Sequence, residues 1–229
     1  MAKEKLVLRC IHRHTIEEHP KCFKKGLVKY DFKSDRDWEK KTGVPWYQFP
    51  GYKIGYFDIE TDNLFADFGI MLTWCLKEKD GKIYHDQVTK KELFNGESDK
   101  RIVKSLLDKM KEYKIVVGYN SDRFDIPFLR ARAMRHGFEF PGYGELYTWD
   151  LYWTARSKLR LTRKTLDNVC DFLGIVGKTP ISKDDWRAAK YGDEKALKTV
   201  LEHNKGDVEI LEELHNKIEF TRKWIRRSV

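Results

Sequence analysis

The stretch KIGYFDIET (residues 53–61) decides the fold of this chain. After Lys53 it is a short apolar run rich in β-formers, and its last residues are polar, as in a central strand that ends at the rim of a sheet. Asp58 and Glu60 are two residues apart, so their side chains point to the same side of the strand. Two carboxylates at one point repel each other unless a cation neutralises them, and Mg²⁺ prefers oxygen ligands. The stretch therefore indicates a metal site at a sheet edge, although D-x-E alone is a common pattern.

Two further acids lie in segments with patterns of their own. GYNSDRFDIPFL (118–129) has Asp125 at the opening of a predicted helix that directly follows a strand. HNKGDVEILEEL (203–214) has Asp207 on a late predicted helix, whose apolar residues recur at helical spacing. Taken singly, Asp125 could be a helix cap and Asp207 a residue on a solvated helix face. Their company with Asp58 and Glu60 favours a shared site.

These segments resemble a known family. FDIET, GYNSDRFDIPFL and HNKGDVEIL occur in the order of exonuclease motifs I, II and III of the proofreading domain of family B DNA polymerases. They are more similar still to stand-alone 3′–5′ exonucleases related to that domain, which are found in phages and prokaryotes. The resemblance covers roughly residues 52–220 and includes TLDNVCDFLGIVGKT (165–179), similar to the family's helix between motifs II and III. It implies a ribonuclease-H-like fold with a four-acid (DEDD) site. Because the remaining residues are too few for a polymerase palm or fingers, we expect a nuclease alone.

Carried over residue by residue, the resemblance assigns Asp58, Glu60, Asp125 and Asp207 to two Mg²⁺ or Mn²⁺ ions. Two cations about 3.5–4 Å apart can bind the attacking and leaving oxygens of phosphodiester hydrolysis. The implied reaction releases nucleoside 5′-monophosphates from the 3′ end of a single strand, with DNA favoured. The alternatives are a catalytically weak module that binds nucleic acid, and a ribonuclease acting on short RNA. The sequence does not separate DNA from RNA, because recognition of the 2′-hydroxyl depends on geometry.

Four further residues match family positions that contact the substrate. Thr61 and Asn120 match residues at the terminal nucleotide or its neighbour. Phe124 matches an aromatic residue beside the unstacked strand, and it could equally be a core residue. Lys178 matches a lysine near the scissile phosphate, the alternative being an ordinary exposed lysine. Asp150 matches a common family acid, whose role is either structural or in support of the metal ligands, and we do not count it among those ligands.

His203 departs from the family pattern. Motif III of the polymerase type begins with a Tyr, separated by three residues from the acid, and His203 stands at that position relative to Asp207. A sister subclass uses His with four residues between, and one residue of a helix is a rotation of about 100°. His203 therefore occupies the Tyr position. We expect it to orient or deprotonate the attacking water, the alternative being a spectator on a helix face.

The amino-terminal segment RCIHRHTIEEHPKC (9–22) holds five of the chain's eleven Cys and His residues. They are Cys10, His12, His14, His19 and Cys22. Structural Zn²⁺ takes four nitrogen or sulfur ligands, and His19-x₂-Cys22 has a usual knuckle spacing. We expect one structural zinc bound by four of the five, with His12 and His14 as alternatives for one position. The other interpretation is a basic, His-containing tail without metal.

Outside these motifs the pattern predicts an α/β protein with a mixed five-stranded sheet flanked by helices. The other predicted strands are IMLTWCLKE and KIYHDQVT, joined by a turn at Asp80-Gly81, then KIVVGYN and ELYTWDL. The predicted helices are ESDKRIVKSLLDKMKEY, SDRFDIPFLRARAMRHG with a Ser/Asp cap and Pro127 in its first turn, LTRKTLDNVCDFLGI from Thr162 or Thr165, and Ser182 to the end with a break at Gly192. Residues 1–50 form the Cys/His segment and a connecting arm from residue 25, and residues 51–229 the exonuclease domain.

Composition narrows the class of protein. The 229 residues include 45 Lys and Arg against 36 Asp and Glu, a formal charge of +9 that favours a polyanionic partner such as nucleic acid. No apolar run approaches the roughly 18 residues of a membrane span, and the first residues lack a signal-peptide core. We therefore expect a cytosolic protein of a phage or prokaryotic host, without a membrane partner. Cys75 and Cys170 lie in apolar runs and are expected in the core.

Overall fold

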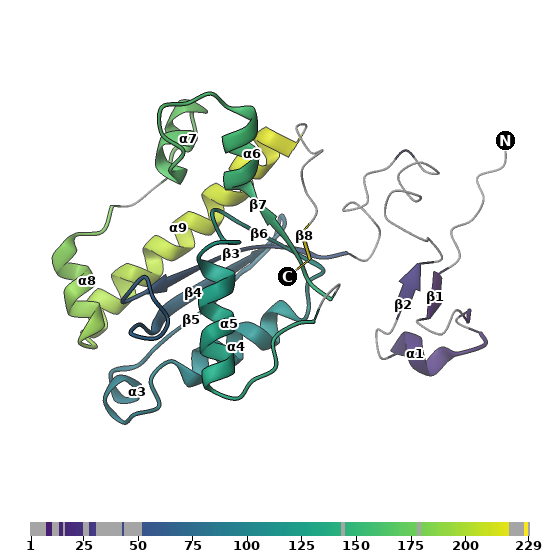
Figure 1. Cartoon of the computed structure of the whole chain (residues 1–229), viewed down its shortest axis with the longest axis horizontal. Helices are drawn as coiled ribbons and strands as arrows, with labels where there is room; N and C mark the ends of the chain where they lie inside the picture. The colour runs from purple at the N-terminus through teal and green to yellow at the C-terminus, as the bar shows by residue number, and fades with distance from the viewer. Residues whose placement is uncertain are drawn as a thin grey trace. The chain divides into compact units, whose positions relative to one another are not determined.

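The computed structural model describes residues 8–10, 14–15, 17–24, 28–30, 43, 52–142, 145–177, 180–219 and 227–228. The chain divides into two compact units, Met1–Gly51 and Tyr52–Val229. Figure 1 shows the helices and strands of both units.

The first unit contains a small two-stranded sheet. β1 (Leu8–Cys10) pairs antiparallel with β2 (Val28–Tyr30), and Cys10 lies opposite Val28. The short helix α1 (Pro20–Lys24) lies in the connection between the two strands. The sequence predicts a connecting arm from residue 25, whereas β2 shows regular structure in that range; most of its other residues lie outside the described part of the chain.

The second unit is built on a mixed sheet with the strand order β5-β4-β3-β6-β7-β8. The strands are β3 (Ile54–Thr61), β4 (Met71–Glu78), β5 (Ile83–Gln87), β6 (Ile115–Gly118), β7 (Tyr147–Asp150) and β8 (Arg227–Ser228). β3 pairs antiparallel with β4 and parallel with β6, which pairs parallel with β7. The predicted mixed five-stranded sheet is confirmed by β3 to β7. The two-residue β8 adds to its edge in a region predicted as helical.

Seven helices are described in this unit. They are α3 (Lys90–Phe94), α4 (Lys100–Met110), α5 (Asp125–Arg135), α6 (Leu151–Lys158), α7 (Leu166–Phe172), α8 (Lys183–Lys190) and α9 (Glu194–Ile218). Thr165, not Thr162, caps α7, and Gly192 separates α8 from α9 with a φ of 76°. Helix α3 was not predicted; Thr89 begins it with a capping box to Glu92. The predicted turn at Asp80-Gly81 joins β4 to β5.

The predicted Ser/Asp cap of α5 is wrong. The helix begins after Phe124, which makes no capping hydrogen bond through its side chain. A Cβ on Gly118 would lie 2.5 Å from Ser121 Cβ, so the chain folds back tightly after β6. Asn120 completes this turn in the left-handed conformation, with a φ of 60°. Ser121 therefore belongs to the turn and not to the helix start.

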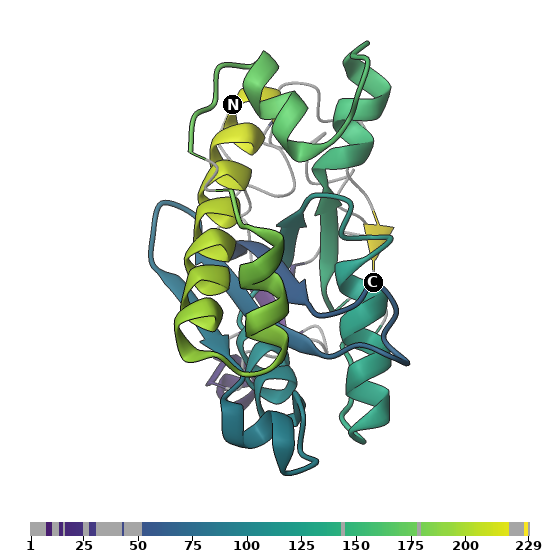
Figure 2. The same cartoon turned by 90° about the vertical axis from the view of Figure 1, so that its left-hand side faces the viewer.

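Helices cover both faces of the sheet, as Figure 2 shows. α9 packs across β3, β4 and β5, while α4 contacts β4, β5 and α5. Along β3, Phe57 and Ile59 belong to the main hydrophobic cluster with Leu106 and Leu107 of α4. The predicted burial of Cys75 and Cys170 is confirmed.

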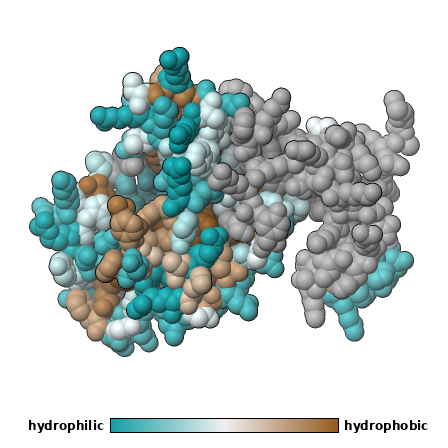
Figure 3. Space-filling view, in the orientation of Figure 1, coloured by the Kyte–Doolittle hydropathy of each residue, from teal (hydrophilic) through white to brown (hydrophobic). Residues whose placement is uncertain are grey.

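The surface of the second unit is mixed. Figure 3 shows hydrophobic and hydrophilic residues interspersed on the face that Figure 1 presents. Among the described residues, no helix combines the length and the apolar character needed to cross a lipid bilayer.

Candidate active site

Strand β3 and helix α9 meet through alternate residues of the strand. The hydroxyl of Tyr56 lies 2.8 Å from His215 Nδ1, and Asn204 Nδ2 donates to Asp58 Oδ2 over 2.7 Å. Glu60 Oε1 lies 3.7 Å from His203 Nε2. Because side chains alternate across a strand, the same side of β3 supplies Tyr56, Asp58 and Glu60. The helix therefore runs antiparallel to β3 and brings its first half to the acidic end of the strand.

A cavity of about 280 Å³ opens at this end of the sheet. Its lining comprises Asp58, Ile59, Glu60, Tyr119, Asn120, Phe124, Asp125, Trp186, His203 and Asp207. The four predicted acids come from β3, the start of α5 and the middle of α9. Strands β3 and β6 end beside it, which is the edge where parallel sheets commonly bind ligands. The structure thus brings together all four acids and three of the other predicted site residues.

Three side chains in this cavity form a compact group of potential metal ligands. Ligand atoms of Glu60, His203 and Asp207 all lie within 4.8 Å of one another. His203 Nε2 is 3.7 Å from Asp207 Oδ2, the same distance that separates it from Glu60. Among the described residues, no other group of three His, Cys, Asp or Glu side chains lies this close together. His203 therefore lies near the acids as predicted, close enough to bind a cation as well as to position water.

Asp125 is the most deeply buried of the four acids, with 3% of its surface exposed. Its Oδ1 accepts a hydrogen bond of 3.2 Å from the N–H of Ile59 on β3. Burial raises the pKa of its carboxyl to about 7, and the backbone donor opposes that shift only in part. An adjacent cation would favour the ionised form, so the environment of Asp125 suits a metal ligand.

Asp150 supports the cavity from behind. Its carboxylate accepts hydrogen bonds from the N–H groups of Asn120 (2.8 Å), Asp122 (3.1 Å) and Tyr152 (2.9 Å). Burial raises its pKa to about 6, and the nearby carboxylate of Asp122 adds to this. Asp150 thus holds the turn after β6 and caps α6, which is the structural one of the two roles expected for it.

The predicted substrate residues divide into three groups. Asn120 and Phe124 line the cavity, and the ring of Phe124 also packs on the core, with its centroid 5.7 Å from that of Phe128. Thr61 does not line the cavity; its hydroxyl donates to the carbonyl of Asn63 over 2.7 Å. Lys178 lies outside the described residues.

Three polar or aromatic side chains of the site were missed by the sequence analysis. Asn204 holds Asp58, and Tyr119 and Trp186 line the cavity. Asn204 lies three residues before Asp207 on the same face of α9, a spacing that could have identified it. Trp186 lies on α8, in a segment without a motif, so nothing in the sequence relates it to the acids.

The five candidate zinc ligands belong to the first unit. His14, His19 and Cys22 are described with their side chains, whereas only the backbone of Cys10, on β1, is described. His12 lies outside the described residues.

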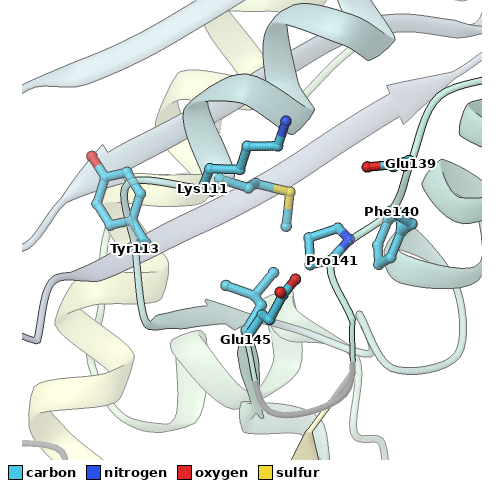
Figure 4. A pocket seen from close by; sticks show the side chains of 8 residues that line it. Lys111, Tyr113, Glu139, Phe140, Pro141 and Glu145 are labelled. Carbon is cyan, nitrogen blue, oxygen red and sulfur yellow. The ribbon is translucent and has the colours of Figure 1, made fainter. Parts of the chain in front are cut away.

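A second cavity, of about 380 Å³, lies at the opposite edge of the sheet (Figure 4). Its lining includes Tyr113 and Glu145, which precede the amino ends of β6 and β7. Its charged groups are Lys111, Glu139 and Glu145, and Figure 4 shows no convergence of acids there. It lacks the constellation found at the carboxyl edge.

Comparisons with known proteins agree with this architecture. Residues 55–219 match the family model of the RNase H superfamily. The chain is 30% identical over 164 residues to a DNA polymerase of Methanocaldococcus jannaschii, covering 58% of this chain and 10% of that protein. It is 29% identical over 191 residues to DNA polymerase 2 of Aeropyrum pernix, covering 71% of this chain and 22% of that protein. The chain thus spans less than a quarter of the length of either polymerase.

A solved structure shows the same fold. The family B DNA polymerase from the hyperthermophilic archaeon Pyrobaculum calidifontis superimposes with a TM-score of 0.60 at 23% identity. The match covers 74% of this chain and 25% of that one.

Proposed function

The chain belongs to the RNase H superfamily, and from this premise we propose that it is a metal-dependent 3′–5′ exonuclease acting on single-stranded nucleic acid. One observation carries the proposal: Asp58, Glu60, Asp125 and Asp207, from three distant segments, line one cavity. Chance would not bring four carboxylates to one site, because their mutual repulsion destabilises the fold unless cations are bound.

The donor set fits hard divalent cations. Four carboxylates line the cavity, and none of its described lining residues is Lys or Arg. Carboxylate oxygens are the ligands that Mg²⁺ and Mn²⁺ prefer. Asp58, Glu60, Asp125 and Asp207 would hold two such ions, with His203 beside Glu60 and Asp207. When bound, the ions would supply charge stabilisation at the phosphate and activation of the attacking water.

The chain's own residues prepare this site. The amide of Asn204 fixes one oxygen of Asp58, and the N–H of Ile59 fixes one of Asp125. Such bonds hold the carboxylates in place before substrate arrives. His203 Nε2 faces the carboxylates, from where it can accept a proton from the attacking water. Phe124 and Trp186 provide aromatic surface for an unstacked terminal base.

A basic segment beside the cavity suits the phosphates of a single strand. Residues 156–164 contain Arg156, Lys158, Arg160, Arg163 and Lys164 and no acid. The hydroxyl of Tyr119, which lines the cavity, donates to the carbonyl of Lys164 over 2.6 Å, so this segment borders the site. The named relatives are DNA polymerases, and we therefore favour DNA as substrate.

End-labelled oligonucleotides test the proposal. We expect 5′-labelled single-stranded DNA to shorten stepwise from its 3′ end in Mg²⁺ or Mn²⁺, to remain intact in EDTA, and to yield 5′-mononucleotides. A circular single strand of the same sequence should resist, since it has no end. The matching RNA oligonucleotide measures the preference between DNA and RNA.

Two results would overturn the proposal. Cleavage of the circular strand would indicate an endonuclease. Binding of the linear strand without any shortening in either cation would indicate a nucleic-acid-binding module instead.

A further inference from the structure

The Cys and His residues of the first unit take no part in the proposed nuclease chemistry. His14, His19 and Cys22 come together around α1, which Figure 1 shows beside β1 and β2. The ring centroids of His14 and His19 lie 5.0 Å apart, and Cys22 Sγ lies 3.4 Å from His19 Nδ1. A tight turn produces this approach, because the N–H of Cys22 donates to the carbonyl of His19 over 3.1 Å.

The separation of sulfur and nitrogen agrees with a zinc site. Zinc binds thiolate sulfur at about 2.3 Å and imidazole nitrogen at about 2.0–2.1 Å in a tetrahedron, which sets its S–N edge at about 3.6 Å. The observed 3.4 Å between Cys22 Sγ and His19 Nδ1 is close to that edge. These two groups can therefore bind one ion with little movement.

Cys10 and His14 are the candidates for the two remaining ligands. Cys10 lies on β1, and its pairing partner on β2 is Val28, which follows Cys22 by six residues along the chain. The ring of His14 already packs edge-on against that of His19. Among the described residues, only Glu60, His203 and Asp207 of the second unit form a group of three whose ligand atoms all lie within 4.8 Å of one another. The side chains of His14, His19 and Cys22 are farther apart than that, so His14 must move closer to the other two to complete the tetrahedron.

We propose that Cys10, His14, His19 and Cys22 bind one Zn²⁺ that stabilises the first unit. Binding deprotonates the two thiols, and the two protons pass to solvent. The four ligands fill the tetrahedron and leave no position for substrate, so the ion is structural.

The small size of the unit gives it a need for such an ion. Its described strands have three residues each and its helix five. Among its residues whose exposure is described, Cys22 alone is buried. Small units that lack a sufficient apolar core commonly depend on metals or disulfides.

Metal analysis of the full chain tests the site. We expect about one zinc per chain to survive mild EDTA, and Co²⁺ substitution to give the intense near-ultraviolet absorption of thiolate-to-cobalt charge transfer. Cys22→Ser should lose both the zinc and about half or more of this absorption. Cys170→Ser, which changes a buried cysteine on α7, is the matched control and should keep both.

Three further variants keep the inference falsifiable. Cys22→His should retain zinc with a weaker cobalt absorption, which separates loss of a ligand from loss of the fold. His14→Asn should release zinc to EDTA, whereas His12→Asn should not. Asp207→Asn, in the second unit, should leave the zinc content unchanged, so this result does not depend on the nuclease proposal. The site would be overturned if wild type prepared without chelators contained no zinc, or if Cys22→Ser retained all of its zinc. The assignment of His14 would be overturned if His12→Asn released zinc to EDTA and His14→Asn did not.

Discussion

Asp125 carries the clearest electrostatic conflict in the molecule. Burial raises the pKa of its carboxyl to about 7 in the cation-free protein, whereas an exposed Asp has a pKa of about 4. At a pH between these two values, the carboxyl of Asp125 holds a proton in the folded chain and has lost it in the unfolded chain. Because stability falls with pH wherever the folded state binds more protons, Asp125 destabilises the cation-free protein increasingly as pH rises through this window.

We expect Asp125→Asn to remove this loss. In EDTA, the free energy of unfolding of the variant minus that of wild type should grow as pH rises from about 4 to about 7, and then stay constant. Denaturant unfolding at several pH values measures it, with the exposed Glu139→Gln as a control that should show no such trend. A difference between Asp125→Asn and wild type that is independent of pH would contradict the burial argument.

His203 is close enough to the acids to serve in either of two ways. If it positions the attacking water, as we propose, His203→Ala should lower kcat by about 10²-fold and leave Mn²⁺ affinity nearly unchanged. His203→Tyr should recover part of the rate, because His203 stands where motif III of the family that the sequence resembles has a Tyr. Turnover at saturating Mg²⁺ and calorimetric titration with Mn²⁺ measure the two quantities. Full turnover of His203→Ala would make it a spectator, and a large loss of affinity would make it a ligand.

The sequence predicts charged site residues better than their neutral partners. The four acids and His203 stand in motifs with fixed spacing, and the structure brings all five to one cavity. Asn204 was missed because its spacing to Asp207 places it near the acids but does not show which carboxylate on β3 its amide will contact. The direction of the hydroxyl of Thr61 was also beyond prediction, because the loop carbonyl that it contacts is set by tertiary structure.

A buried ion pair joins several elements behind the site. Asp99, at the start of α4, is fully buried and accepts hydrogen bonds from Arg132 of α5 (2.6 Å) and the N–H of Met71 on β4 (2.8 Å). Arg132 also donates to the carbonyl of Ala66 over 3.1 Å, in the loop after β3. Although burial opposes ionisation, the bonds from Arg132 and Met71 outweigh it and lower the pKa of Asp99.

Breaking this pair from one side should be costly. We expect Asp99→Asn to lower the free energy of unfolding by about 3–5 kcal/mol, because it leaves the guanidinium of Arg132 buried without its counter-charge. The double variant Asp99→Leu/Arg132→Met should lose less. Asp108→Asn, which removes exposed ion pairs on α4, is the control and should cost less than about 1 kcal/mol. Equal effects of Asp99→Asn and Asp108→Asn would contradict the importance of the buried pair.

The basic segment 156–164, which includes the last turn of α6 and most of the connection to α7, leads to a prediction about binding. Each phosphate neutralised on a single strand contributes about −0.7 to the slope of log K against log salt. Arg160→Ala/Arg163→Ala should therefore weaken binding and reduce that slope by about 1.4. Lys111→Ala, beside the second cavity, should change neither quantity. Fluorescence anisotropy with a labelled oligonucleotide at several salt concentrations measures this, and an unchanged slope would exclude the segment from the binding path.

Elements were predicted where local pattern and tertiary structure agree. The apolar spacing of α4 and the turn between β4 and β5 are local features, and both are observed. The start of α5 was misjudged because Gly118 and Asp150 hold Ser121 and Asp122 in a turn before the helix. That constraint comes from β7. The hydroxyl of Thr148 on β7 donates to the carboxylate of Asp122, although the two residues are 26 positions apart in the sequence.

The whole second unit explains how distant motifs form one site. β3 lies at the centre of the sheet, and α9 crosses it antiparallel, so the end of the strand meets the first half of the helix. The ribonuclease-H-like fold expected from the sequence is confirmed by the family match, and the similarity to DNA polymerases is confirmed by the relatives. The order of strands in the sheet could not be read from periodicity, which gives the type of an element and not its neighbours.

One comparison of rates tests the proposed four-acid catalysis most directly. Release of 5′-mononucleotides from a single-stranded DNA should be measured in Mg²⁺ for wild type, Asp58→Asn, Asp207→Asn and the control Glu139→Gln, with circular dichroism to verify folding. We predict that wild type and Glu139→Gln release mononucleotides at similar rates, and that both Asp variants lose at least about 10³-fold while remaining folded. Each variant removes a proposed ligand of a cation whose charge stabilisation would amount to several kcal/mol. Metal-dependent release by folded Asp58→Asn or Asp207→Asn at the wild-type rate would contradict the assignment of this cavity as the active site.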